Sequence, residues 1–287
     1  MSVLEARPPA ARPAGPRYAP VRALMLMLTE ACNMRCSYCY QGHAPRRMTL
    51  ETARRSVEFF LSRHISGHER SISIVFFGGE PFLELDLMEE VIAHTRRHLE
   101  EARLSGGRSG VPRDVTFEAT TNGTIFNGRV EHIVRDARMQ LLVSVDGAPA
   151  AAAHRPFASG ASSYEALRRN LPALVRAGSS VAVRMTYHPG ALDLVGNVEH
   201  ALALGAPSIA LCPFLEGEWS GREAALEDAF QALADWSIAR ARRAGRGAAR
   251  RIYETLRAED NAVLAATLKG RTRLGTAFGE LARGGAG

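Results

Sequence analysis

Three cysteines, Cys32, Cys36 and Cys39, lie within eight residues of the chain. Thiolates grouped in this way suit iron–sulfur clusters or zinc. A structural zinc ion needs four ligands, so a zinc site would also require Cys212 or a histidine, and no second cysteine pair lies close by. Three cysteines on a four-iron cluster instead leave one iron without a protein ligand, which is an open position for chemistry. The spacing therefore favours a [4Fe–4S] cluster.

Glycines and charged residues with possible ligand-binding roles lie at or after apolar segments elsewhere in the chain. Gly78 and Gly79 precede Glu80, and adjacent glycines let backbone carbonyls approach a ligand closely, while a carboxylate beside them adds negative charge near an ammonium group. Arg184 stands alone among apolar neighbours, and a buried unpaired arginine is costly. It therefore needs either a bound anion or an acidic partner, for which Asp146 and Glu80 are the candidates.

Apolar segments of strand length alternate with helical patterns from residue 21 to residue 214. We expect strands at residues 21–29, 71–77, 114–120, 140–145, 180–187 and 208–211. We expect helices at residues 50–64, around 88–99, at 129–138, from a capping box at Ser162 and Glu165 to Gly178, and at 192–204. This alternation is typical of a parallel sheet with right-handed crossovers. Six units are too few for a closed eight-fold barrel, so we predict an α/β fold that is a six-unit partial (β/α) barrel.

The residues that could do chemistry fall at or just after the predicted strand ends. In parallel α/β sheets, functional sites collect at the carboxyl ends of the strands. Such positions are taken by the cysteine loop, Gly78 to Glu80, Asn122, Ser144, Asp146, Arg184 and Cys212. We therefore expect one functional rim. Cys212 itself is interpreted as an inert buried thiol and not as a cluster ligand.

The two flanks differ from this central part, which we place at residues 21–215. Residues 1–20 are rich in proline, alanine and arginine and are expected to form a mobile tail. Residues 216–287 are expected to form a helical C-terminal extension, with two helices between Glu223 and Leu281 and a break near Gly245.

Composition narrows the classes of function. The formal net charge is +6 and the isoelectric point is near 9.5, but the arginines are interleaved with acidic residues, which argues against a nucleic-acid surface. The apolar run from Ala23 to Leu28 is too short to span a membrane and suits a buried strand. No signal-peptide pattern precedes Val21, so we expect a cytoplasmic protein with no membrane partner.

The segment from Cys32 to Cys39 resembles the signature loop of the radical S-adenosylmethionine (radical SAM) superfamily, placed directly after the first strand. The resemblance covers roughly residues 21–214 and implies a six-unit partial barrel. It also implies that S-adenosylmethionine (SAM) chelates the open iron of a [4Fe–4S] cluster. One electron then cleaves SAM, and the resulting 5′-deoxyadenosyl radical removes a hydrogen atom from the substrate.

The same resemblance assigns roles to other residues. Tyr38 would pack near the adenine, and Gly78, Gly79 and Glu80 would receive the methionine amino group. Ser144 and Asp146 would meet the ribose and the methionine carboxylate, with Asp146 equally suited to an ordinary turn. Arg184 would pair with the methionine carboxylate, and Asn122 would face the cavity. His154 matches a stretch of peptide-modifying members, although a surface-loop histidine fits its position too, and His188 is interpreted as structural.

Taken together, these motifs most resemble the SPASM-type branch, which contains sulfatase-maturing enzymes and maturases of ribosomal peptides. This implies a peptide or protein substrate, an electron donor such as flavodoxin or ferredoxin, and a separate leader-binding protein as a further partner. The chain departs from the branch because no cysteine follows Cys212, so we expect either an enzyme that works with one cluster or a shortened version of the branch without its Cys-rich C-terminal domain. Two alternatives remain: a radical SAM enzyme that acts on a small-molecule metabolite, and a non-catalytic partner protein that bears the cluster.

Overall fold

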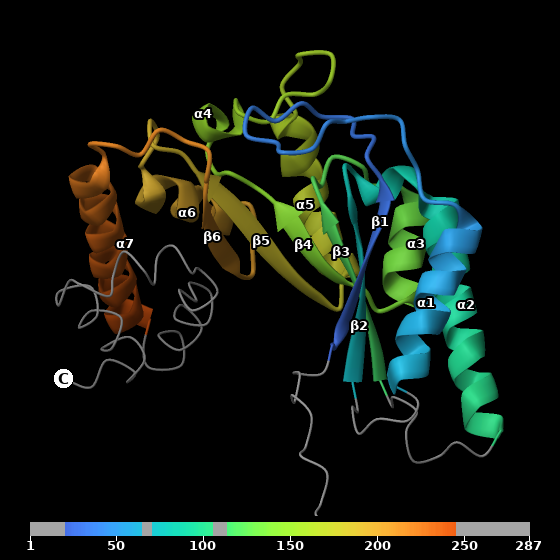
Figure 1. Ribbon diagram of the computed structural model, residues 1–287. Coiled ribbons are helices and arrows are strands. Elements are labelled where there is room, and N and C mark those ends of the chain that lie inside the picture. Colours follow the sequence, from blue (N-terminus) through green and yellow to red (C-terminus); the bar gives the residue numbers. More distant parts are fainter. Residues whose placement is uncertain (1–20, 65–70, 106–113, 245–287) are drawn as a thin grey trace, which may run out of the picture.

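Six parallel strands form one sheet in the order in which they occur in the chain. The computed structural model describes residues 21–64, 71–105 and 114–244 (Figure 1). The strands are β1 (Ala23–Thr29), β2 (Ser71–Gly78), β3 (Asp114–Thr121), β4 (Gln140–Ser144), β5 (Ser180–Tyr187) and β6 (Ile209–Pro213). Every neighbouring pair is parallel, so all six carboxyl ends lie at one edge of the sheet. The predicted α/β fold with six units is confirmed.

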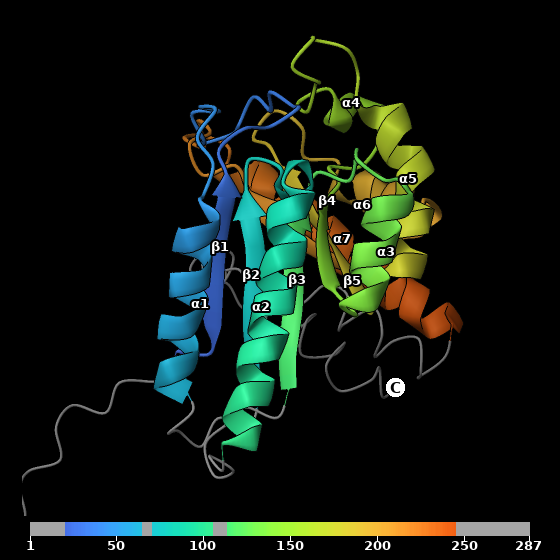
Figure 2. The same cartoon turned by 90° about the vertical axis from the view of Figure 1, so that its right-hand side faces the viewer.

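A helix follows each strand, and these helices cover one face of the sheet. They are α1 (Leu50–His64), α2 (Leu85–Leu104), α3 (Gly128–Asp136), α5 (Tyr164–Ala177), α6 (Leu194–Ala203) and α7 (Glu223–Ala244). Two short elements, the 3-10 helix η1 (Pro81–Leu83) and α4 (Pro149–Ala152), follow β2 and β4. Figure 2 shows α1, α2 and α3 against the same side of the sheet.

Alternation along the strands separates the core from the other face. Leu26 and Leu28 of β1 are buried against the helices, whereas Met25 and Met27, which alternate with them along the strand, are 59% and 42% exposed. In β5, Val183 and Met185 are buried and Arg184 between them is exposed. The side chains on the face opposite the helices therefore lie outside the hydrophobic core.

Local signals placed several elements correctly. Helix α1 begins after Thr49, whose hydroxyl accepts a hydrogen bond from the Thr52 backbone N–H at 3.1 Å, and helix α5 stops before Gly178 as expected. The predicted capping box was wrong, because Ser163 rather than Ser162 precedes α5 and its hydroxyl donates to the Arg155 carbonyl.

The flanks are described only in part. Helix α7 confirms the first helix of the C-terminal extension, whereas the tail at residues 1–20 and the second helix after Gly245 lie outside the described residues. Among the helices that the structure describes, none is long and apolar enough to cross a membrane.

Candidate functional site

A cavity of about 250 Å³ lies at the carboxyl ends of the strands. The loop after β1 passes over this edge of the sheet, at the top of Figure 1. Predicted site residues that line the cavity are Cys32, Cys36, Tyr38, Cys39, Gly78, Gly79, Asn122, Ser144 and Arg184. Glu80 and Asp146, the other two, are buried behind its wall and bond to residues that line it.

The cysteine loop is fastened to two neighbouring segments. The Asn122 side-chain amide donates to Asn33 Oδ1 at 2.8 Å, and the Asn33 amide donates to Thr124 Oγ1 at 2.9 Å. On the other side, the Arg35 N–H donates to the Pro156 carbonyl at 2.9 Å. These contacts hold the loop between the end of β3 and the segment after α4, which fixes where its thiols point.

The three thiols of the loop are free and half-buried. Cys32 Sγ accepts hydrogen bonds from the Met34 N–H at 3.4 Å and from Asn122 Nδ2 at 3.8 Å. Burial raises the pKa of Cys32, and it raises the pKa of Cys36 to about 11. Within the described ranges, no group of three or more His, Cys, Asp or Glu side chains is placed to hold a metal ion. The thiolates of a four-iron cluster bind separate irons, and three thiols around one cavity with N–H donors to sulfur fit such a cluster.

Gly78 and Gly79 are required by the close approach of β2 to the cysteine loop. Gly78 has φ +136°, and a Cβ there would overlap the Thr29 carbonyl, while a Cβ on Gly79 would overlap the carbonyl of Ala31. The Gly79 N–H donates to the Thr29 carbonyl at 2.8 Å. The Gly78 carbonyl accepts from Gln41 Nε2 at 2.9 Å. The glycines therefore bring the end of β2 against the backbone that carries the cysteines.

Glu80 links the ends of β2 and β3. Its carboxylate is fully buried and accepts hydrogen bonds from the N–H groups of Asn122 at 2.7 Å and Phe82 at 3.0 Å, and from the Thr121 hydroxyl at 2.9 Å. Burial nevertheless raises the pKa of Glu80 to about 7. Its predicted contact with a ligand ammonium stays a prediction, and within the chain Glu80 positions Asn122.

Asp146 lies in a buried network with Tyr38 and Arg155. The Tyr38 hydroxyl donates to Asp146 Oδ2, the Thr186 N–H donates to Asp146 Oδ1 at 3.2 Å, and Arg155 donates to the Tyr38 hydroxyl at 3.0 Å. Arg155 Nη1 lies 3.8 Å from Asp146 Oδ1, and both side chains are almost fully buried. Burial raises the pKa of Asp146 and of Tyr38, although the positive charge of Arg155 opposes both shifts.

Arg155 is the site residue that sequence reasoning missed. The only signal was its place beside His154 in a stretch matched to peptide-modifying members. The sequence offered Asp146 as an ion-pair partner for Arg184, but in the structure Arg155 is the ion-pair partner of Asp146.

Arg184 instead points into the cavity. Its Nη2 donates to Cys212 Sγ at 3.0 Å, and among the described residues it makes no ion pair with Asp146 or Glu80. Ser144 is its in-register neighbour on β4 and also lines the cavity. The two side chains together could receive an anionic ligand group.

A model of the radical SAM superfamily matches residues 26–193 of the chain. The chain belongs to this superfamily. Its cofactors are a [4Fe–4S] cluster and SAM, which the thiols and the cavity fit. The family prediction is thereby confirmed.

Known radical SAM proteins resemble the chain over different spans. The serine-type anaerobic sulfatase-maturating enzyme of Klebsiella aerogenes is 28% identical over 239 residues, which is 79% of this chain and 53% of that protein. The GTP 3′,8-cyclase of Stenotrophomonas maltophilia is 35% identical over 128 residues, 43% of this chain and 33% of that protein. The structure of anSMEcpe with bound AdoMet and Cp18Cys peptide superposes with a TM-score of 0.64 at 16% identity, over 76% of this chain and 60% of that one. The chain thus spans only one third to about one half of these curated relatives.

Two further predictions about this radical SAM site are corrected or refined by the structure. Cys212 is half-buried and lines the cavity, so the expectation that its thiol is buried was wrong. His154 stacks on His188 with ring centroids 4.5 Å apart, and its Nδ1 lies 2.9 Å from the Ser37 hydroxyl of the cysteine loop. His154 is therefore tied to the site and is not an isolated surface histidine.

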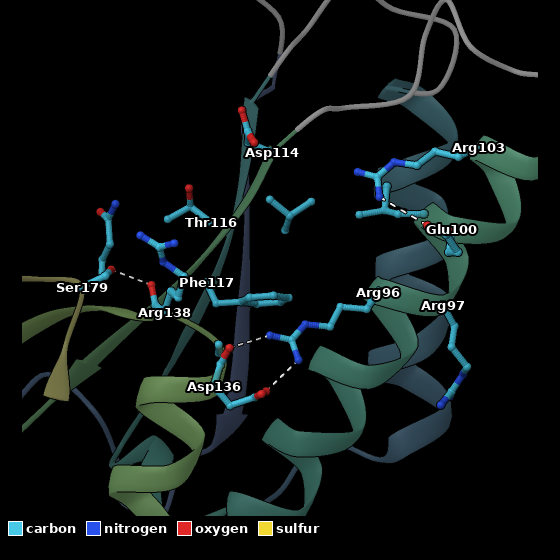
Figure 3. A pocket seen from close by; sticks show the side chains of 14 residues that line it. Arg96, Arg97, Glu100, Arg103, Asp114, Thr116, Phe117, Asp136, Arg138 and Ser179 are labelled. Atoms are coloured by element: carbon cyan, nitrogen blue, oxygen red, sulfur yellow. Dashed lines mark hydrogen bonds and ion pairs between the residues drawn. The ribbon is translucent and has the colours of Figure 1, made fainter.

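A second hollow, of about 910 Å³, lies away from this radical SAM site, at the amino-terminal ends of β3 and β4 (Figure 3). Its lining includes Arg96, Arg97, Arg138 and Asp136. Arg96 donates to the Asp136 carboxylate at 2.7 Å and to the Asp136 carbonyl at 2.8 Å. No predicted site residue lines this hollow.

Proposed function

We propose that this chain is a radical SAM enzyme that cleaves SAM reductively at a [4Fe–4S] cluster and removes a hydrogen atom from a peptide or protein side chain. The observation that carries the proposal is one cavity that joins the three thiols of the cysteine loop to polar groups from the other strand ends. When bound, the cluster and SAM supply a 5′-deoxyadenosyl radical as the hydrogen-abstracting group.

The residues of the chain divide the work of binding and positioning. Cys32, Cys36 and Cys39 hold three irons and leave the fourth open. Arg184, with Ser144 beside it, receives the methionine carboxylate through charge-assisted hydrogen bonds. Tyr38 packs near the adenine, and its hydroxyl is fixed by the buried network with Asp146.

The choice of a peptide or protein substrate rests on the relatives. The sulfatase-maturating enzyme matches four fifths of the chain, and the similar anSMEcpe structure contains a bound peptide. A flavodoxin or ferredoxin as electron donor and a separate leader-binding protein are the partners that this proposal implies. The cytoplasm is the compartment in which such donors act.

A small-molecule metabolite is the second candidate substrate. The GTP 3′,8-cyclase has a higher identity than the sulfatase-maturating enzyme, although over a shorter span. The two candidates share every proposed step up to hydrogen abstraction, and they differ only in what enters the cavity.

Anaerobic reconstitution followed by reduction in the presence of SAM tests the proposal. We expect 5′-deoxyadenosine and methionine to form in equal amounts with the wild-type chain. Cys36→Ala is the matched control and should form neither, because it leaves a second iron without a ligand. A fully reconstituted wild-type chain that forms no 5′-deoxyadenosine would refute the proposal.

A further inference from the structure

Cys212 is the one cysteine of the chain that lies outside the loop, and it shares the cavity with the other three. The loop follows β1, at one edge of the sheet, whereas Cys212 lies on β6 at the opposite edge. Both edges supply cavity wall, so a group bound between them has thiols on two sides.

Arg184 determines how the Cys212 thiol is oriented. A guanidinium has donors and no acceptor, so in the 3.0 Å contact the sulfur accepts through a lone pair. Its S–H hydrogen is thereby directed away from Arg184, and within the described residues Cys212 donates no hydrogen bond. The S–H group is held on the cavity wall without an internal acceptor.

A thiol in this position has a specific use in radical chemistry. The S–H bond is weaker than an alkyl C–H bond, so a thiol transfers its hydrogen atom to a carbon radical, whereas the stronger O–H bond of a serine does not. A cavity that forms a carbon radical on one side and offers a thiol from the other side can therefore exchange one hydrogen atom for another.

We propose that Cys212 is a catalytic residue that returns a hydrogen atom to the substrate radical, a step that rests on the proposed function. The Cys212 S–H bond breaks, a substrate C–H bond forms, and a sulfur-centred radical remains. One electron from the low-potential donor that also reduces the cluster, and one proton from solvent, restore the thiol. Each turnover then consumes one SAM and two electrons. The substrate gains a solvent-derived hydrogen from the face opposite the abstraction, so a stereogenic carbon is inverted.

Cleavage of SAM without any substrate, in deuterated buffer free of small thiols, tests whether the thiol reaches a carbon radical in the cavity. In the wild-type chain the exchanged S–D group should place one deuterium in most of the 5′-deoxyadenosine. In Cys212→Ser and Cys212→Ala the deuterated fraction should fall at least ten-fold. The serine variant is the matched control, since it keeps an exchangeable polar group beside Arg184 without the weak bond. An equal deuterium content in the serine variant overturns the proposal.

Alkylation of the reconstituted protein gives a readout that needs no turnover. Cys212 is then the one thiol that is not a cluster ligand, and iodoacetamide should add one group per chain at Cys212. SAM without reductant should slow this addition at least ten-fold, because both occupy one cavity. Labelling only after unfolding, or labelling unaffected by saturating SAM, contradicts the placement.

The two proposals fail in different ways. If the wild-type chain forms no 5′-deoxyadenosine, the proposed function fails and takes the role of Cys212 with it. If 5′-deoxyadenosine forms but its deuterium does not depend on Cys212, the radical SAM function stands and only the role of Cys212 is lost.

Discussion

The two ends of the sheet carry hollows that differ in volume and in how deeply the ion pairs beside them are buried. The hollow at the amino-terminal ends is the larger, at about 910 Å³ against about 250 Å³. Its ion pair between Arg96 and Asp136 is about half exposed, whereas Arg155 and Asp146 beside the smaller cavity are almost fully buried. Burying a charged group costs free energy, so a buried ion pair is expected where it holds a functional group in position. The difference indicates that buried ionic groups locate this site better than the volume of a hollow does.

The largest effect is expected at the cysteine loop. Cys36→Ala should lose the cluster, against about four irons per chain in the wild type, since the change leaves a second iron unliganded. Cys212→Ala should retain all of its iron. Iron and sulfide analysis after anaerobic reconstitution decides this, and a full cluster in the Cys36 variant would show that the ligands are misassigned.

Removal of Arg155 should destabilise the chain strongly. Arg155→Leu leaves Asp146 buried without its charge partner, and breaking a buried pair from one side costs about 3–5 kcal/mol. Urea unfolding of the cluster-free chain measures this difference in free energy. A decrease in the free energy of unfolding below about 1 kcal/mol would mean that the network beside the cavity stabilises the chain no more than a surface ion pair does.

Glu80 should make stability depend on pH. Its pKa is raised from 4.5 to about 7, so the folded chain binds more protons than the unfolded chain between these values. The free energy of unfolding therefore falls as the pH rises through this window, by about 3 kcal/mol from this group alone. Glu80→Gln should remove that share of the slope in urea titrations between pH 5 and pH 8. Parallel curves for the two proteins would contradict the assignment.

The smallest effect is expected at the larger hollow. Arg96→Leu is the matched counterpart of Arg155→Leu, and an exposed pair such as Arg96 with Asp136 contributes roughly 0–1 kcal/mol. Iron content and SAM affinity should stay at the wild-type values. A destabilisation equal to that of Arg155→Leu would remove the contrast between the two ends of the sheet.

The sequence predicted the rim because its signals are local. The spacing of the three cysteines, the paired glycines and the strand ends all lie within short segments, and parallel strands place their carboxyl ends together. Helix α1 was placed equally well, since Thr49 caps it through a contact three residues away.

Long-range packing explains what the sequence did not show. Arg155 is buried because its segment packs against the cysteine loop, and its contact with Tyr38 joins residues 117 positions apart. Ser163, the residue before α5, makes no capping hydrogen bond with its side chain, because its hydroxyl donates to the Arg155 carbonyl of that same segment. The apolar pattern predicts a strand that ends at Leu211, just before Cys212. Strand β6 runs to Pro213 instead, so Cys212 lies within the strand and lines the cavity.

Electron paramagnetic resonance of the reduced, reconstituted chain with and without SAM tests the central claim most directly. That claim is that the cavity at the carboxyl ends holds both the cluster and SAM. We expect SAM to change the spectrum of the wild-type cluster, because it binds the open iron. Arg184→Ala should require about ten- to a hundred-fold more SAM for the same change, as one charge-assisted hydrogen bond contributes roughly 1.5–3 kcal/mol. A full cluster whose spectrum is identical with and without saturating SAM would contradict the account.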